Sequence, residues 1–326
     1  MKDKSFKRDF CAIMRAQISV QTENGKTRIS QKGMFINMNK RQLSKYFPVF
    51  VLPALVAFCI GFLYPFVRGI YLSFCTFRTT SDAKWVGISN YIEALSDAGF
   101  LYSFVFTALF TIVSVIAINV LAFTVAYVLT SGIRGANVFR TVFFMPNLIG
   151  GVILGYIWQI IFDGILQNYG TNIKLDSTFG FWGLVILLCW QQIGYMMIIY
   201  ISGLNSIPDH LYEAAKVDGA TKWQTLRRVT LPMMMPSITI CTFLTLTNSF
   251  KLFDQNLALT AGEPGLQVGG ETVYQTEMLA LNIYNTFYQN MNTRGVGQAK
   301  AVVFFILVAV IGLVQLYLTR RKEVQQ

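Results

Sequence analysis

The sequence predicts an all-helical membrane protein with six transmembrane helices and with both termini in the cytoplasm. Three observations lead to this prediction: the scarcity of charge, the length of the uncharged stretches and the distribution of the basic residues. Hydrophobic residues make up 54% of the chain and charged residues 13%, whereas a soluble domain carries about 25% charged residues. A chain with so little charge cannot cover a water-facing surface of its own size.

The uncharged stretches are long enough to cross a bilayer. A transmembrane helix needs about 20 mainly apolar residues, whereas an apolar run of about 10–14 residues is more typical of a buried core helix. Six stretches of sufficient length are present, at residues 46–67, 98–133, 141–162, 177–208, 229–250 and 301–319.

The basic residues indicate the orientation in the membrane. Of the 27 Lys and Arg residues, 20 lie in four segments, at 1–45, 131–140, 204–228 and 320–326. These segments alternate along the chain with the segments expected on the other side of the membrane, and cytoplasmic loops carry the excess of Lys and Arg. We therefore interpret the net charge of +11 as an orientation signal and expect no nucleic-acid partner.

The elements are expected in the following order. A basic, disordered cytoplasmic tail over 1–45 precedes a transmembrane domain over 46–319, and a short cytoplasmic tail covers 320–326. The six spans are placed at about 46–73, 100–130, 141–163, 180–203, 231–257 and 297–319. Outside segments over 74–99 and 258–296 and a cytoplasmic loop over 204–230 connect them.

The cytoplasmic loop between spans four and five is the most informative segment. It reads LNSIPDHLYEAAKVDGATKWQTLRRVTLP from Leu204 to Pro232. Pro208 suits the first turn of a helix, and Gly219 suits the left-handed turn that ends one. A second, basic helix is expected around 221–230. On these grounds alone, the loop is either a docking element or an ordinary amphipathic surface segment.

The order of residues within the loop favours docking. EAAKVDGA, followed by TLP at Thr230–Pro232, resembles the EAA loop of ABC importer permeases. The resemblance implies that the loop holds a coupling helix, which docks on a separate ATPase. The family's motif matches Glu213, Ala214, Ala215, Asp218 and Gly219.

The resemblance extends over about 46–319 to sugar permeases of the maltose and glycerol-phosphate type, without the maltose permease's large periplasmic insertion. FVLPALVAFCIGFLYPF and RTVFFMPNLIGGVILGYIWQIIF are examples of matching segments. It implies a type I ABC importer permease core in the bacterial cell membrane. It further implies three kinds of partner: a second homologous permease subunit, an ATPase dimer and an extracellular or periplasmic solute-binding protein.

We expect no catalytic residue, metal or cofactor in this chain, and expect ATP and Mg on the partner ATPase. A phosphate-binding loop requires GxxxxGK[ST]. The nearest approach, Gly265 to Gly270, is followed by Glu271 instead of Lys.

Polar residues within the spans are candidates for a translocation path, because they are costly in lipid. In span five, Asn248, Lys251 and Gln255 fall at i, i+3 and i+7, which is one helical face, and Lys251 is placed to pair with Asp254. By resemblance, Asn248 aligns with a sugar-contacting position of the family. Span four adds Gln191, Gln192 and Tyr195. The alternative for these residues is helix packing or an interfacial aromatic belt.

Two other functions were weighed against an importer subunit. A self-sufficient secondary transporter or channel needs intramembrane acids or His as coupling groups, and the six uncharged stretches contain none. A membrane enzyme needs clusters of such groups, and the only histidine, His210, lies in the cytoplasmic loop.

Overall fold

The computed structural model describes residues 51–268 and 270–320. The expected tail over 1–45 and, of the expected tail over 320–326, residues 321–326 lie outside the described residues. The chain divides into two compact units, Met1–Leu63 and Tyr64–Gln326. In the first unit, residues 51–63 are helical and end in a π-helical segment at Cys59–Leu63.

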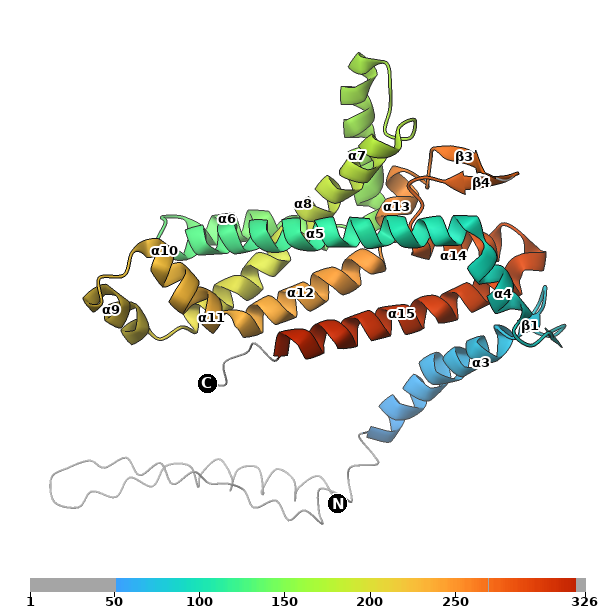
Figure 1. Cartoon of the computed structure of the whole chain (residues 1–326), viewed down its shortest axis with the longest axis horizontal. Helices are drawn as coiled ribbons and strands as arrows, with labels where there is room; N and C mark the ends of the chain where they lie inside the picture. Colours follow the sequence, from blue (N-terminus) through green and yellow to red (C-terminus); the bar gives the residue numbers. More distant parts are fainter. Residues whose placement is uncertain (1–50, 269, 321–326) are drawn as a thin grey trace, which may run out of the picture. The chain divides into compact units, whose positions relative to one another are not determined.

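The second unit is predominantly helical (Figure 1). Its helices are α3 (Tyr64–Leu72), α4 (Ser89–Ser96), α5 (Ala98–Thr130), α6 (Ala136–Phe144), α7 (Gly151–Leu166), α8 (Ser177–Asn205), α9 (Asp209–Val217), α10 (Lys222–Thr225), α11 (Leu231–Met233), α12 (Met235–Phe250), α13 (Asp254–Leu259), α14 (Leu279–Tyr288) and α15 (Arg294–Arg320). Short 3-10 helices lie at Met145–Leu148, Gln167–Tyr169 and Met291–Thr293, and a π-helical segment lies at Leu226–Thr230.

Two small antiparallel hairpins interrupt the helices. Strand β1 (Cys75–Thr76) pairs with β2 (Lys84–Trp85), and β3 (Gly265–Val268) pairs with β4 (Glu271–Tyr274). The hairpins lie in the two segments expected outside the membrane, where no strands were predicted.

The prediction of a helical membrane protein is confirmed in its coarse form. Among the described residues, four helical segments are long and apolar enough to cross a membrane, and they correspond to predicted spans one, two, four and six. These are Val51–Leu72, Ala98–Thr130, Ser177–Asn205 and Met291–Thr319. Two bent helix pairs raise the count to six if each pair forms one span.

The chain is sharply bent in two of the predicted spans, span three at 141–163 and span five at 231–257. The chain bends by 101° between Ala136–Leu148 and Gly151–Tyr169, and by 70° between Lys222–Met233 and Met235–Phe250. Pro146 lies before the first bend and Pro236 just after the second. Proline lacks the amide hydrogen that a continuous helix requires, so it favours such breaks.

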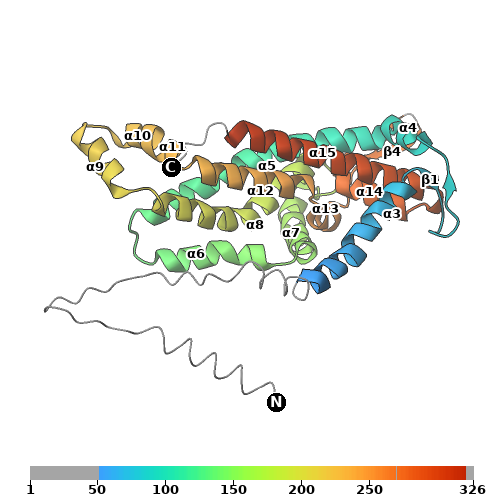
Figure 2. The ribbon, with the colours of Figure 1, turned by 90° about the horizontal axis from the view of Figure 1, so that it is seen from below.

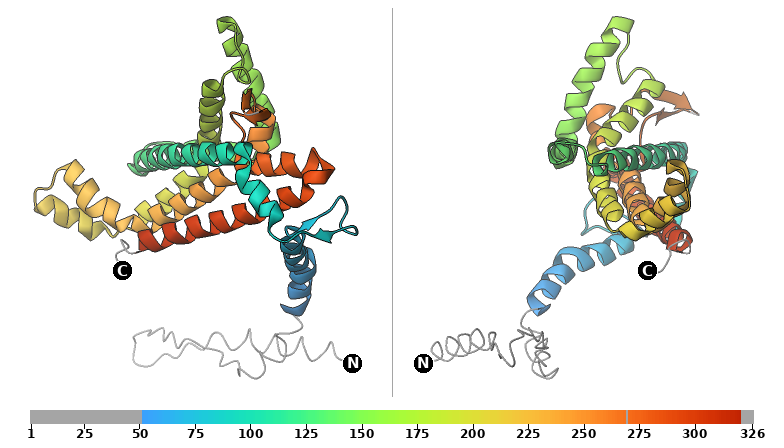
Figure 3. Two further views of the ribbon diagram at one scale, coloured as in Figure 1. Left: turned by 45° about the vertical axis from the view of Figure 1, so that its right-hand side comes forward. Right: turned by 90° about the vertical axis from the view of Figure 1, so that its left-hand side faces the viewer.

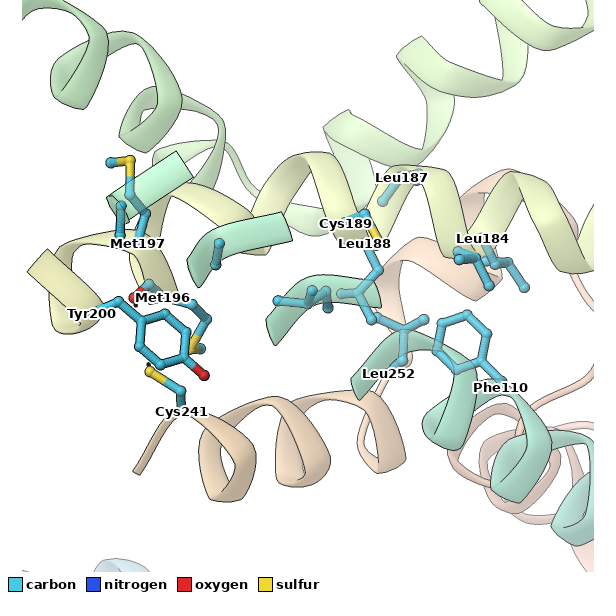
Figure 4. Close-up of a cluster of buried hydrophobic side chains, with 14 of the residues drawn as sticks. Phe110, Leu184, Leu187, Leu188, Cys189, Met196, Met197, Tyr200, Cys241 and Leu252 are labelled. Carbon is cyan, nitrogen blue, oxygen red and sulfur yellow. Dashed lines mark hydrogen bonds between the residues drawn. The ribbon is translucent and has the colours of Figure 1, made fainter. Parts of the chain in front are cut away.

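The core of the second unit lies where α8 packs against α5 and α12. Figure 4 shows its buried side chains, including Phe110, Leu184, Met196 and Cys241. Tyr200 donates to Asn119 Oδ1 at 2.6 Å, and Asn119 donates to Thr245 Oγ1 at 3.0 Å. This polar chain ties the three helices together, as amides commonly do within membranes.

Glycines allow two close helix contacts. A Cβ at Gly194 of α8 would lie 1.9 Å from the Phe143 carbonyl oxygen of α6. A Cβ at Gly155 of α7 would lie 2.6 Å from Ala258 Cβ of α13. A Cβ at Gly151 would likewise lie 2.7 Å from Asp254 Cβ, so these two glycines let α7 pack closely against α13.

The long helices place two loop regions at opposite ends of the second unit. Figures 1 and 2 show α5, α12 and α15 running side by side, with α9 and α10 at one end and α4 and α14 at the other. Figure 3 shows α9 and α10 projecting beyond the ends of these helices.

Candidate functional site

The loop containing the EAA motif folds into two short helices joined by a tight turn. Helix α9 ends at Val217, Asp218 is its C-cap, and Gly219 follows with φ of +69°. The Ala220 amide donates to the Ala215 carbonyl oxygen at 2.9 Å. The predicted left-handed glycine turn is therefore present.

The second helix starts with reciprocal capping bonds, and the helical segment that it opens runs from Lys222 to Met233, so the helix expected around 221–230 is present. The Thr221 amide donates to Gln224 Oε1 at 2.8 Å, and the Gln224 amide donates to Thr221 Oγ1 at 3.3 Å. Helix α10 ends at Thr225, and the chain continues through a π-helical segment into α11. The C-terminus of α9 and the N-terminus of α10 are thus both stabilised by hydrogen bonds, which hold the Gly219 turn in place.

The surface of this loop combines a cleft with exposed apolar side chains. A cleft of about 460 Å³ lies between α9 and the helix that follows, lined in part by Ala214, Ala215, Asp218, Gly219 and Arg228. Val217 and Trp223 are 87% and 67% exposed beside it. Among the expected coupling residues, Ala215 is buried against the loop itself, and Glu213, Ala214, Asp218 and Gly219 are exposed.

The structure brings together four of the predicted path residues as two pairs of amides. Gln255 of α13 donates to Gln191 Oε1 of α8 at 2.7 Å. Asn248 of α12 and Gln192 of α8 form a longer contact of 3.4 Å. Gln191 is buried, whereas Asn248, Gln192 and Gln255 are half-buried.

The predicted common helical face is wrong for span five. Helix α12 ends at Phe250, and a new helix starts at Asp254, so Asn248 and Gln255 belong to different helices. Lys251 is exposed in the intervening turn, and no ion pair joins it to Asp254 in the part of the chain that the structure describes. Tyr195 is half-buried and packs against the core.

A buried ionic cluster was missed by the sequence reasoning. Lys300 of α15 is 1% exposed and forms an ion pair with Asp97, which precedes α5. The same ammonium donates to Asn282 Oδ1 at 3.0 Å and to Thr286 Oγ1 at 2.8 Å. A lysine inside predicted span six requires a partner. Lys300, together with Asp97 just before span two, could therefore have indicated a buried ion pair from the sequence.

A second carboxylate lies next to this cluster. Glu277 accepts from Asn282 at 2.7 Å and from Asn285 at 2.6 Å. Burial raises the pKa of Glu277, although the two amide donors and the Lys300 charge act in the opposite direction. The cluster therefore links the segment before α14, helix α14 itself, and the ends of α5 and α15 through charge-assisted bonds.

The two amide pairs supply hydrogen-bonding groups that carry no net charge. No group of three or more His, Cys, Asp or Glu side chains within residues 51–268 and 270–320 is arranged to hold a metal ion.

The family model for the binding-protein-dependent transport system inner membrane component matches residues 120–324. The chain belongs to this family. It is a multi-pass membrane permease subunit of an ABC importer, in which separate subunits hydrolyse ATP.

Relatives cover most of this permease. It is 43% identical over 285 residues to the probable starch degradation products transport system permease protein AmyD of Thermoanaerobacterium thermosulfurigenes, covering 85% of this chain and 94% of AmyD. It is 30% identical over 296 residues to the multiple sugar-binding transport system permease protein MsmF of Streptococcus mutans, covering 87% of this chain and 99% of MsmF.

A solved structure shows the same fold. The permease matches a chain of a bacterial ABC transporter involved in alginate import with a TM-score of 0.71 and 20% identity, covering 86% of this chain and 98% of that one.

Proposed function

We propose that this permease lines the translocation path for a neutral saccharide. The two amide pairs between α8 and the α12–α13 segment carry the proposal. An amide offers a donor and an acceptor without net charge, which is what sugar hydroxyls require. The names of AmyD and MsmF support this class of cargo, and we infer saccharides of the kind released from starch.

The two amide pairs have different roles in this proposal. The 2.7 Å bond between Gln255 and Gln191 holds α13 against α8. The 3.4 Å contact between Asn248 and Gln192 exceeds the usual range for such bonds. Its atoms are therefore free to exchange partners with a passing hydroxyl at low cost. Lys251 and Tyr195 are secondary candidates, because Lys251 is exposed near the end of α12 and Tyr195 is half-buried on α8.

In the assembled importer, we propose six spans with both termini in the cytoplasm. The α9–α10 loop then faces the cytoplasm, where Glu213, Ala214, Ala215, Asp218 and Gly219 form the coupling surface for an ATPase dimer that binds ATP and Mg. A second, homologous permease completes the path, and a solute-binding protein delivers the cargo at the α14 end. The alternating distribution of Lys and Arg supports this orientation.

Replacing Asn248 by Ala tests the path. Loss of a neutral hydrogen-bonding partner costs about 0.5–1.5 kcal/mol, so maltotriose uptake per assembled complex is expected to fall about two- to tenfold. Uptake and the amount of complex are measured in the same vesicles, with binding protein and ATP supplied.

Asn119→Ala provides the contrasting variant, because Asn119 joins Tyr200 and Thr245 in the core. It should reduce the amount of complex but leave uptake per complex unchanged. If Asn248→Ala behaves in the same way, Asn248 is a packing residue. Maltotriose uptake by vesicles containing this chain alone would instead identify a self-sufficient transporter.

Replacing Gly219 by Ala tests the coupling surface. A side chain at positive φ costs about 1–2 kcal/mol, so the turn should shift and ATPase association should weaken about fivefold or more. Gly170→Ala is the matched control, because Gly170 has φ of +72° and, like Gly219, has open space around its Cβ position. Copurification of the ATPase is measured for both variants, and equal retention would rule out the role of Gly219.

A further inference from the structure

An aromatic pocket of about 390 Å³ lies near the α12–α13 turn. Phe253 of this turn, Tyr284 and Tyr288 of α14 and Gln298 of α15 contribute to its lining. The ring centroids of Phe253 and Tyr284 are 5.1 Å apart, and those of Tyr284 and Tyr288 are 4.7 Å apart. The pocket volume lies within the range of about 300–1,000 Å³ that is common for small-molecule sites.

The rings of this pocket are held in place but remain accessible. Tyr284 and Tyr288 lie four residues apart and therefore on one face of α14, and they are 41% and 61% exposed. Residues of α14 on the other side, Asn282 and Thr286, are bound to Lys300. The buried ionic cluster thus fixes the helix that presents the two rings.

Phe253 places the pocket between the two chain segments that carry the proposed path. Phe253 lies between the end of α12, which carries Asn248, and the start of α13, which carries Gln255. Helix α14 lies at the opposite end of the unit from the α9–α10 loop (Figures 1 and 2). A cargo entering at the α14 end would therefore meet the aromatic rings before the amides.

We propose that Phe253, Tyr284 and Tyr288 form a saccharide subsite in which a ring face stacks on the apolar face of a pyranose. This inference rests on the proposed function. Aromatic faces supply large contact areas at low entropic cost, and tyrosine hydroxyls and the Gln298 amide add hydrogen-bonding groups. A purely interfacial aromatic belt requires neither a concave pocket nor a ring in the turn between α12 and α13.

The test uses the complete importer in vesicles, with maltotriose as the probe. Tyr284→Leu removes the ring face but keeps apolar bulk, and Tyr284→Phe keeps the ring; the same two changes are made at Tyr288. The readout is the ratio of maltotriose imported to ATP hydrolysed, with both rates expressed per assembled complex. Weaker docking of the binding protein lowers both rates together, whereas impaired sugar passage lowers the ratio. Each Leu variant should lower this ratio about two- to tenfold, and each Phe variant should stay within about twofold of the unmodified importer.

Tyr102→Leu is the matched control, because Tyr102 lies on α5 near the same end and is also 41% exposed. An equal loss in this control would show that exposed tyrosines act only as a membrane belt. Unchanged ratios in both Leu variants, together with a lowered uptake in Asn248→Ala, would overturn the aromatic subsite and leave the proposed function standing. No maltotriose uptake by the unmodified importer, with uptake of an unrelated solute, would overturn both.

Discussion

Replacing Lys300 by Met is expected to destabilise the protein by about 3–5 kcal/mol, the usual cost of removing one partner from a buried ion pair. The substitution leaves Asp97 without its cation and removes the donor to Asn282 and Thr286. The ends of α5, α14 and α15 then lose the ion pair and hydrogen bonds that connect them. Unfolding of the purified importer in detergent is the measurement.

Lys251→Met is the matched control for this prediction. Lys251 is exposed at the end of α12, and the described part of the chain holds no acid in an ion pair with it. Its replacement should change stability by about 0.5 kcal/mol or less. Adding Asp97→Asn to Lys300→Met should recover part of the loss, since the unpaired carboxylate is removed. Equal stabilities of the two single variants would contradict the role of the buried cluster.

Replacing Gly194 by Ala is expected to cost about 3 kcal/mol, at the upper end of the usual range for overpacking. The new Cβ would lie 1.9 Å from the Phe143 carbonyl oxygen and 2.3 Å from its carbonyl carbon. These are backbone atoms, so no side-chain rotation relieves the clash. Helix α6 would have to move away from α8.

Gly164→Ala separates this clash from the general effect of replacing a helical glycine. Gly164 lies in α7, and its Cβ position has no neighbour within 4 Å. Alanine is favoured over glycine in a helix by about 1 kcal/mol, so this variant should be as stable as the original or more stable. Retained stability in Gly194→Ala would show that α6 is not held tightly against α8.

The sequence predicted the long helices well because length and lack of charge determine them. Spans two and four were placed within three residues of α5 and α8 at each end. The bends were missed because Pro146 and Pro236 lie in apolar runs, where hydropathy does not distinguish a straight helix from a broken one. In membranes such prolines are also tolerated within continuous helices, so a proline alone does not predict a break in the helix.

The candidate site was predicted in its composition but not in its geometry. Gln191 and Gln255 were both selected, yet their direct bond depends on α13 starting at Asp254, which no pattern in span five indicated. The Gly219 turn was predictable because a left-handed turn favours a specific residue type. Lys300 was missed because its partners lie far away in sequence, at Asp97 and on α14.

Helix α12 connects the α9–α10 loop to the amide pairs. It follows the 70° bend after the α9–α10 loop and carries Asn248 near its far end. From Met235 to Asn248 it spans about 20 Å at 1.5 Å per residue. Over about 20 Å, a tilt of about 10° displaces the far end by about 3.5 Å. The Asn248–Gln192 contact is already 3.4 Å long, so a displacement of this size away from α8 would separate the two amides.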